Sequence, residues 1–165
     1  MKRTTNKIVL ASMLSALVFI LTRVISVPTV TAVGNVNLGD CAVLLCGWLL
    51  PCRYAFLSAG IGSALADLLS PYAIYTPATF LIKGLMAVIV SLLLNRSKGS
   101  TTVKTILSGI VAELVMIAGY LVFEGVFICG FKTAILNIPF NAVQGTVGLV
   151  AGVLLFSAFR KINKK

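Results

Sequence analysis

Charged side chains are rare in this chain, and five of them fall within or at the ends of long apolar stretches. They are Asp40, Asp67, Lys83, Glu113 and Glu124. If these stretches lie in a bilayer, an isolated charge near its centre costs about 2.5–3.5 kcal/mol even on a lenient insertion scale. We therefore expect Lys83 to pair with an acid, with Asp67 as the first choice and Glu124 as the alternative. Such a pair could either fasten helices together or belong to a binding site.

Polar residues near these charges recur at helical spacing. Thr79 lies four residues before Lys83, which places both side chains on one face of a helix. Tyr120 has the same spacing to Glu124, and Glu113 lies seven residues before Tyr120 on the same stripe. Each stripe would direct its polar side chains toward the interior of the predicted helical bundle.

A third stripe carries amides near the C-terminal end of the chain. It contains Asn137, Asn141, Gln144 and Gly148. Amides that face lipid would lack hydrogen-bond partners, so this stripe is expected to face the bundle. A single amide could serve only to join two helices. Tyr72, Tyr75 and Trp48 add aromatic surface, although tyrosines are also common where a membrane meets water.

Together these groups predict a site for a small, flat, polar ligand that both stacks and forms hydrogen bonds. The candidate binding residues are Lys83, Thr79, Tyr120, Glu124, Asn141, Gln144, Asp67, Asp40 and Tyr75. Catalytic chemistry is not indicated, because the chain has no histidine and no GxxxxGK[ST] phosphate loop. Its four cysteines form no CxxC pair. We expect no enzyme activity, no metal site and no cofactor.

The composition indicates what must position these side chains. The 165 residues are 59% hydrophobic and 11% charged, with a mean hydropathy of +1.06, whereas soluble domains are about a quarter charged. This predicts an all-α integral membrane protein with one domain, residues 1–165. The net charge of +10 does not indicate nucleic-acid binding, because the basic residues fall between apolar stretches and at both termini.

Six apolar stretches are candidate membrane spans, since about 20 apolar residues cross the hydrocarbon core. They are residues 8–27, 41–50, 54–69, 77–94, 103–128 and 136–159. The break between the second and third rests on Pro51 and Arg53. A single bent helix there would leave five spans. A cleaved signal peptide is the alternative for the first stretch, because it follows a basic start.

The basic residues predict the orientation, because lysine and arginine concentrate in cytoplasmic loops. Six spans would put eleven of them on one side: Lys2, Arg3, Lys7, Arg53, Arg96, Lys98, Lys104, Arg160, Lys161, Lys164 and Lys165. The other side would receive Arg23 and Lys132. Both termini are therefore expected in the cytoplasm. The long loop 26–40, rich in turn-forming residues, would then lie outside, either as a lid over the bundle or as a plain connector.

Two stretches resemble the substrate-binding S components of energy-coupling factor (ECF) vitamin transporters. The first is residues 37–89, with "LGD" opening a short helix and "GIGSALADLLSPYAIYTPATFLIKGLMA" after it. The second is "FNAVQGTVG", residues 140–148. The resemblance extends over most of the chain. It implies a compact six-helix membrane bundle, and a multi-pass location in the plasma membrane of a prokaryotic cell.

The resemblance also implies partners. Such proteins bind a vitamin from outside, beneath the first loop, and join a transmembrane coupling subunit and two ABC-type ATPases. The family contact for the coupling subunit is a small-xxx-small pattern on the first helix. Here it is Ala11-xxx-Ser15, with Ser12-xxx-Ala16 beside it, and the sequence leaves open which pair makes the contact.

The closest resemblance is to members assigned to hydroxymethylpyrimidine or pyridoxine, although riboflavin-type members share the broad family. Two other functions compete with this one. The intramembrane carboxylates would suit a self-sufficient transporter coupled to protons or sodium, but the two halves show no inverted repeat. A membrane enzyme would have to use Lys83 or a carboxylate.

Overall fold

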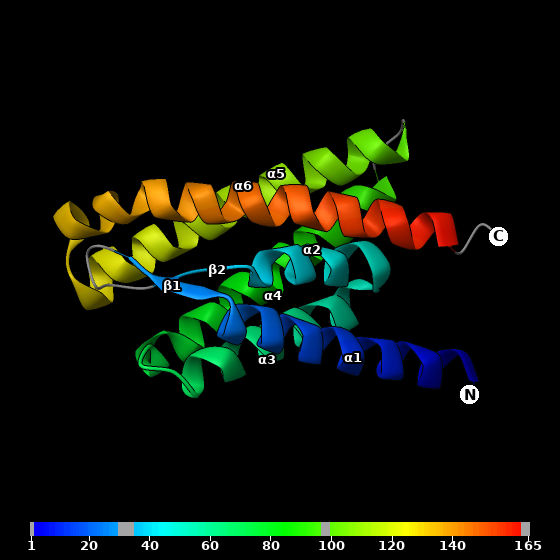
Figure 1. Ribbon diagram of the computed structural model, residues 1–165, viewed down its shortest axis with the longest axis horizontal. Helices are drawn as coiled ribbons and strands as arrows, with labels where there is room; N and C mark the ends of the chain where they lie inside the picture. Colours follow the sequence, from blue (N-terminus) through cyan, green and yellow to red (C-terminus); the bar gives the residue numbers. More distant parts are fainter. Residues whose placement is uncertain (1, 30–34, 97–99, 163–165) are drawn as a thin grey trace.

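Six α-helices, two short helical turns and one β-hairpin make up the residues that the computed structural model describes, which are 2–29, 35–96 and 100–162 (Figure 1). In chain order these are α1 (Lys2–Val24), β1 (Ser26–Pro28), β2 (Asn35–Asn37), α2 (Gly39–Leu49), α3 (Cys52–Leu68), η1 (Ala73–Tyr75), α4 (Thr76–Arg96), α5 (Thr101–Phe123), η2 (Glu124–Ile128) and α6 (Phe131–Ile162). η1 is a 3₁₀ turn, and η2 is a π-helical turn that continues α5. The predicted helical bundle is confirmed, and each predicted apolar stretch forms a helix.

Four helical segments of the described chain are long and apolar enough to cross a membrane. They are Thr4–Val24, Ala73–Leu94, Thr101–Ile128 and Phe131–Ile162. α2 has 11 residues and α3 has 17, which is fewer than the roughly 20 that a full crossing needs. Six crossings therefore remain a prediction where these two helices are concerned.

The short helix α2 lies inside the bundle, where it packs against α1, α3, α4 and α6. Ten of its residues are buried. Because protein surrounds α2, it does not have to match the thickness of a bilayer to satisfy its apolar side chains. Its second residue, Asp40, is thereby held in the interior without any exposed surface.

Gly47 allows α2 and α4 to approach closely, and its replacement tests this packing. A Cβ at Gly47 would lie 2.5 Å from the Val90 Cβ and 2.7 Å from the backbone oxygen of Ala87. Because that backbone cannot rotate away, Gly47→Ala should lower the free energy of unfolding by about 1–3 kcal/mol, measured by unfolding in detergent. Gly109→Ala is the matched control, since its Cβ would meet chiefly the end of the Leu149 side chain. Equal losses in both variants would contradict the interpretation.

The helical conformation is interrupted between α2 and α3, so the alternative of one long bent helix is wrong. Leu50 is extended, with φ −115° and ψ 150°, and Pro51 is extended with φ −62° and ψ 149°. Proline has no N–H group and disfavours a helical residue before it, which ends α2. The Pro51 carbonyl then accepts hydrogen bonds from the amides of Tyr54 and Ala55 in the first turn of α3.

A β-hairpin follows α1 and was not predicted. β1 and β2 pair antiparallel in the register Ser26↔Asn37, Val27↔Val36 and Pro28↔Asn35. α1 therefore ends at Val24, three residues before the predicted end of the first span. Strands of three residues are too short to show an alternating pattern, so no periodicity in the sequence predicts them.

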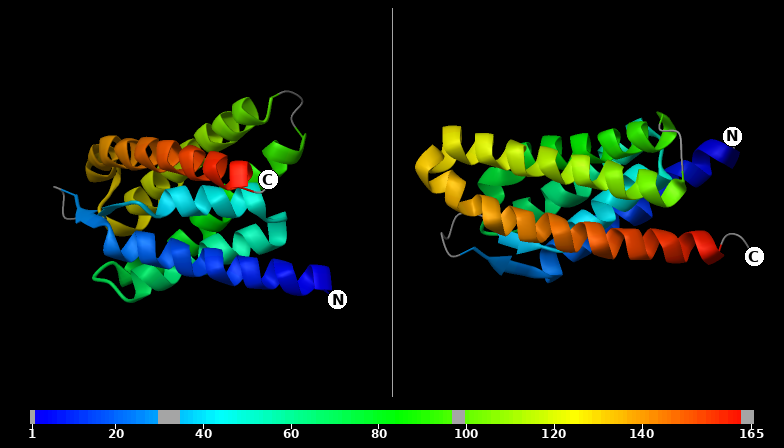
Figure 2. Two further views of the ribbon diagram at one scale, coloured as in Figure 1. Left: turned by 45° about the vertical axis from the view of Figure 1, so that its right-hand side comes forward. Right: turned by 90° about the horizontal axis from the view of Figure 1, so that it is seen from above.

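The elements define two ends of the bundle. α1 begins and α6 ends at the same end, and the hairpin lies at the opposite end with η2 and the start of α6 (Figures 1 and 2). The cytoplasmic face that we predicted from charge would correspond to the end where α1 begins. Lys98, Lys164 and Lys165 of that prediction lie outside the described residues.

Candidate functional site

A polar cavity lies among the helices toward the hairpin end of the bundle. It encloses about 30 Å³ and is lined by Thr22, Thr29, Asn35, Asn37, Ser63, Asp67, Tyr72, Tyr75, Thr79, Lys83, Tyr120, Glu124, Asn137, Asn141 and Gln144. Every one of these side chains carries a polar group. Burying polar groups is unfavourable unless they find partners, so such a concentration within an apolar bundle indicates a binding site.

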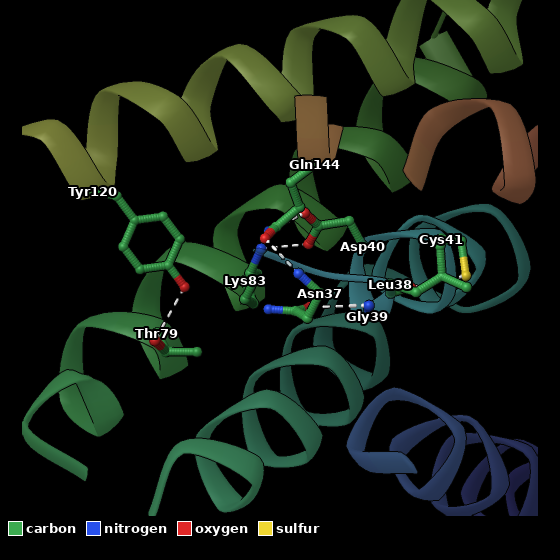
Figure 3. A network of polar contacts seen from close by, with 9 residues as sticks. All are labelled: Asn37, Leu38, Gly39, Asp40, Cys41, Thr79, Lys83, Tyr120 and Gln144. Atoms are coloured by element: carbon green, nitrogen blue, oxygen red, sulfur yellow. Dashed lines mark hydrogen bonds and ion pairs between the residues drawn. The ribbon is translucent and has the colours of Figure 1, made fainter. Parts of the chain in front are cut away.

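Lys83 forms an ion pair with Asp40 beside this cavity (Figure 3). Lys83 is 3% exposed and Asp40 is 0% exposed. The expectation that Lys83 is paired is confirmed, but the choice of Asp67 is wrong. α3 and α4 are consecutive antiparallel helices, so Asp67 near the end of α3 is level with the start of α4. Lys83 lies about 10 Å further along α4, at 1.5 Å per residue, where it meets the N-terminus of α2.

Gln144 and Asn37 extend this ion pair into a network that joins four elements, β2, α2, α4 and α6. The Gln144 side chain donates from Nε2 to Asp40 Oδ2 over 2.6 Å. The Asn37 amide donates to Gln144 Oε1 over 2.9 Å, and the Gly39 amide donates to Asn37 Oδ1 over 3.0 Å. Figure 3 shows these bonds converging on the start of α2. The network therefore ties β2 of the hairpin to α6 and α2.

Glu124 is the centre of a second polar group. It opens the π-helical turn η2 and is buried. The Tyr75 hydroxyl donates to its Oε1 over 3.3 Å, and Asn137 Nδ2 donates to its Oε2 over 2.8 Å. Both partners of this carboxylate are neutral. π-Helical turns are frequent at functional sites, which is consistent with this position.

Aromatic rings form one wall of the cavity. The Tyr75 ring packs against those of Tyr72, Tyr120 and Phe123, with centroid distances of 6.4, 6.3 and 5.4 Å. The Tyr120 hydroxyl lies 3.0 Å from Thr79 Oγ1, which orients its ring toward α4 (Figure 3). Ring faces and hydrogen-bonding edges therefore occur together, as recognition of a flat polar molecule requires.

Most of the predicted site residues meet at this cavity. Lys83, Thr79, Tyr120, Glu124, Asn141, Gln144, Asp67 and Tyr75 line it. Asp40 does not line it, because it lies behind Lys83 as the partner of the ammonium group. The amide stripe of α6 faces inward as predicted, with Asn137 and Gln144 buried and Asn141 at the cavity.

Several lining residues were missed, and one aromatic prediction was wrong. Five lining residues were not predicted as site residues: Thr22, Thr29, Asn35, Asn37 and Ser63. Ser63 could have been found, since it lies one turn before Asp67 on the same face of α3. Trp48 does not add to the cavity, because its Nε1 donates to Ser108 Oγ over 3.0 Å and its ring packs against Phe156.

Glu113 is separate from the cavity. It is buried, and neither of its carboxylate oxygens has a hydrogen-bond partner within the described chain. It lines a groove of about 280 Å³ between α5 and α6, with apolar residues and Thr146 around it. The periodicity that links it to Tyr120 therefore does not bring the two side chains into one site.

A larger groove of about 640 Å³ lies between α1 and α3. Its lining includes all four small residues predicted to contact the coupling subunit: Ala11, Ser12, Ser15 and Ala16. Ser12 and Ala16 are exposed, whereas Ala11 and Ser15 are half-buried against α3. Ser58 Oγ on α3 donates to the backbone oxygen of Ala11 over 2.7 Å, which fixes this helix crossing. Ser12 and Ala16 are therefore more accessible to a partner than Ala11 and Ser15.

Comparison with known proteins agrees with this architecture. Residues 2–161 match the family model of the ECF-type riboflavin transporter S component. A Pyrococcus woesei protein, described as an uncharacterized protein in the gap 3′ region, is 31% identical over 136 residues, or 82% of this chain and 88% of that protein. The solved structure of the S component of a bacterial ECF transporter has a TM-score of 0.80 at 19% identity, covering 98% of this chain and 99% of the other. The chain therefore belongs to the family of ECF-type riboflavin transporter S components.

Proposed function

We propose that this S component, a substrate-binding transporter subunit rather than an enzyme, binds a small aromatic heterocycle of the hydroxymethylpyrimidine or pyridoxine class. The observation that carries the proposal is the combination of aromatic rings with amide, hydroxyl and charged groups around one cavity. A hydroxylated six-membered heterocycle presents two faces for stacking and an edge with several donors and acceptors. The rings of Tyr72, Tyr75 and Tyr120 would contact the faces, and Asn141 and Gln144 would bond the edge.

The size of the cavity favours a small substrate. Its volume of about 30 Å³ is far below the roughly 300–1,000 Å³ that is usual for ligand pockets. Entry of any substrate therefore requires the lining to move outward. The described parts of the loop contribute Thr29, Asn35 and Asn37 to the lining of the cavity, which supports a role for this loop as a lid. A one-ring heterocycle needs less expansion than a three-ring flavin.

We also propose the arrangement in the membrane. The predicted distribution of basic residues, with eleven on the side of the termini, supports cytoplasmic termini in the plasma membrane of a prokaryotic cell. The cavity would then face outward, where a scarce nutrient has to be captured. The α1–α3 groove would receive a helix of the coupling subunit, and two ABC-type ATPases would supply the energy.

Replacing Asn141 by leucine tests whether the amide stripe binds the substrate. Loss of one partner in a site built for hydrogen bonding leaves a buried group unpaired, at about 1–3 kcal/mol. We therefore expect affinity to fall about tenfold to a hundredfold. Calorimetry with pyridoxine or hydroxymethylpyrimidine, whichever the unmodified chain binds, measures the loss. Val143→Leu is the control, since Val143 is exposed on the other side of α6. Unchanged binding by Asn141→Leu would make the amide structural.

A self-sufficient transporter coupled to protons or sodium remains the alternative function. The observation that favours it is Glu113, an intramembrane carboxylate without a hydrogen-bond partner in the described chain. Proteoliposomes that contain this chain alone distinguish the two functions. Accumulation of substrate under a proton or sodium gradient would favour the alternative. Accumulation only with the coupling subunit, both ATPases and ATP would favour the ECF mechanism.

A further inference from the structure

The residues that line the cavity carry more negative than positive groups. Lys83 is the one cation among the described lining residues, and it is already paired with Asp40 behind it. Asp67 and Glu124 also line the cavity and are buried. Neither forms an ion pair with any residue in the described parts of the chain. Lys83 attracts Asp67 electrostatically but forms its ion pair with Asp40. Removing carboxylates from water without an ion-pair partner is unfavourable, so Asp67 and Glu124 each lack a directly paired counter-charge.

The other basic residues of the described chain do not supply that paired counter-charge. Residues 30–34, between the strands of the hairpin, read VTAVG and contain no charged side chain. Arg23 and Lys132 are the basic residues nearest this end of the bundle in sequence. Both are exposed, and neither lines the cavity. A cation that balances Asp67 or Glu124 would therefore come from outside the protein.

Ser63 provides an independent indication that a ligand atom belongs here. Its side chain is 1% exposed and lines the same cavity, one helical turn before Asp67 on α3. Its hydroxyl has no hydrogen-bond partner among the residues that the structure describes. Buried polar groups in native proteins nearly always have a partner, and an orphaned one calls for an explanation. A polar group of a substrate between Ser63 and Asp67 would satisfy it.

We propose that the substrate is a cation, with a protonated nitrogen and its N–H donors directed at Asp67 and Glu124. This inference rests on the proposed function, which puts the substrate in this cavity, and it narrows the substrate class to cations. The ammonium or protonated ring nitrogen of a small heterocycle would replace the missing counter-charge and bond the Ser63 hydroxyl. An uncharged flavin or an anionic vitamin would leave both carboxylates uncompensated.

Two pairs of probes that differ at one nitrogen test the proposal. Pyridoxamine carries an ammonium group where pyridoxine has a hydroxyl, and hydroxymethylpyrimidine has an amino group that its 4-oxo analogue lacks. Calorimetry at pH 7 on the full chain in detergent should show tenfold to hundredfold tighter binding of the nitrogen-bearing member in at least one pair, the usual range for a charged hydrogen bond. Tighter or equal binding of the other members would overturn the proposal.

Three variants test which carboxylate causes the preference for the nitrogen-bearing probes. Asp67→Asn and Glu124→Gln keep the size of the side chain and remove its charge, while one accepting oxygen becomes a donating amide group. At least one of them should bring the ratio of the two affinities close to one. Glu113→Gln is the matched control, because it removes a buried carboxylate that does not line the cavity, and it should leave the ratio unchanged. A ratio that survives in both cavity variants would contradict the proposal, and thermal unfolding checks that all three variants fold.

Failure of the substrate class can be separated from failure of the charge inference. If no probe binds, native mass spectrometry of the purified chain identifies a retained compound. A retained cation of another class would uphold the charge inference and replace the hydroxymethylpyrimidine or pyridoxine proposal. A retained neutral or anionic compound would overturn both. A chain that retains nothing and binds no probe would also overturn both.

Discussion

Replacing Lys83 by methionine is expected to cost about 3–5 kcal/mol of folding free energy, because it strands the Asp40 carboxylate in the interior. Asp40 has no exposed surface, and its second oxygen is held by Gln144. Water therefore cannot take the place of the ammonium group without opening the start of α2. The loss should appear as a lower yield of folded protein and a lower unfolding temperature in detergent. Substrate affinity should fall with it, since Lys83 also lines the cavity.

Two controls separate the stranded charge from the loss of a lysine side chain. Adding Asp40→Asn to Lys83→Met removes the unpaired charge and should restore most of the lost stability, although not the affinity. Lys7→Met removes an exposed lysine from α1 and should change stability little. If Lys83→Met expresses, unfolds and binds like the unmodified chain, the ion pair contributes nothing measurable to either the fold or the site.

Filling the α1–α3 groove is expected to abolish ATP-driven uptake while leaving substrate binding intact. Small residues allow helices to approach closely, and leucine at Ser12 and Ala16 would hold an incoming helix away. Both residues are exposed and line the groove, so the larger side chains should not disturb the bundle. Uptake by cells or proteoliposomes that contain the complete transporter measures the loss. Calorimetry on the isolated variant measures binding.

Replacing the other two small residues, Ala11 and Ser15, is expected to have a different effect. Ala11 and Ser15 are half-buried against α3, and a Cβ on Gly62 would lie 2.4 Å from the Ser15 backbone oxygen. Leucine at Ala11 and Ser15 should therefore impair uptake and also reduce stability. Met13→Leu, on an exposed position of α1 outside the groove, is the control. Normal uptake by the variant with leucine at Ser12 and Ala16 would show that the coupling subunit docks elsewhere.

The inward-facing stripes were predictable from the sequence because helical spacing alone sets which side chains share a face. Thr79 with Lys83, Tyr120 with Glu124, and the amides of α6 all reach one cavity for this reason. The same rule failed for Glu113, which packs against Gly145 in the α5–α6 groove. Glu113 and Tyr120 share a face of α5 but lie about 10 Å apart along it, at 1.5 Å per residue, so the two side chains meet different neighbours.

An apolar helical bundle with buried charges could be predicted from the sequence. Composition, proline positions and the resemblance to the S components led to that conclusion, and the helices formed where the apolar stretches lie. The pairing of Lys83 with Asp40 rather than Asp67 depends on the tertiary structure, and so does the contribution of β2 to the lining of the cavity. The tertiary structure also places Ser63, Asp67 and Glu124 around the same cavity. Those outcomes depend on the relative depth and rotation of helices that are distant in the sequence, which the local spacing of residues does not encode.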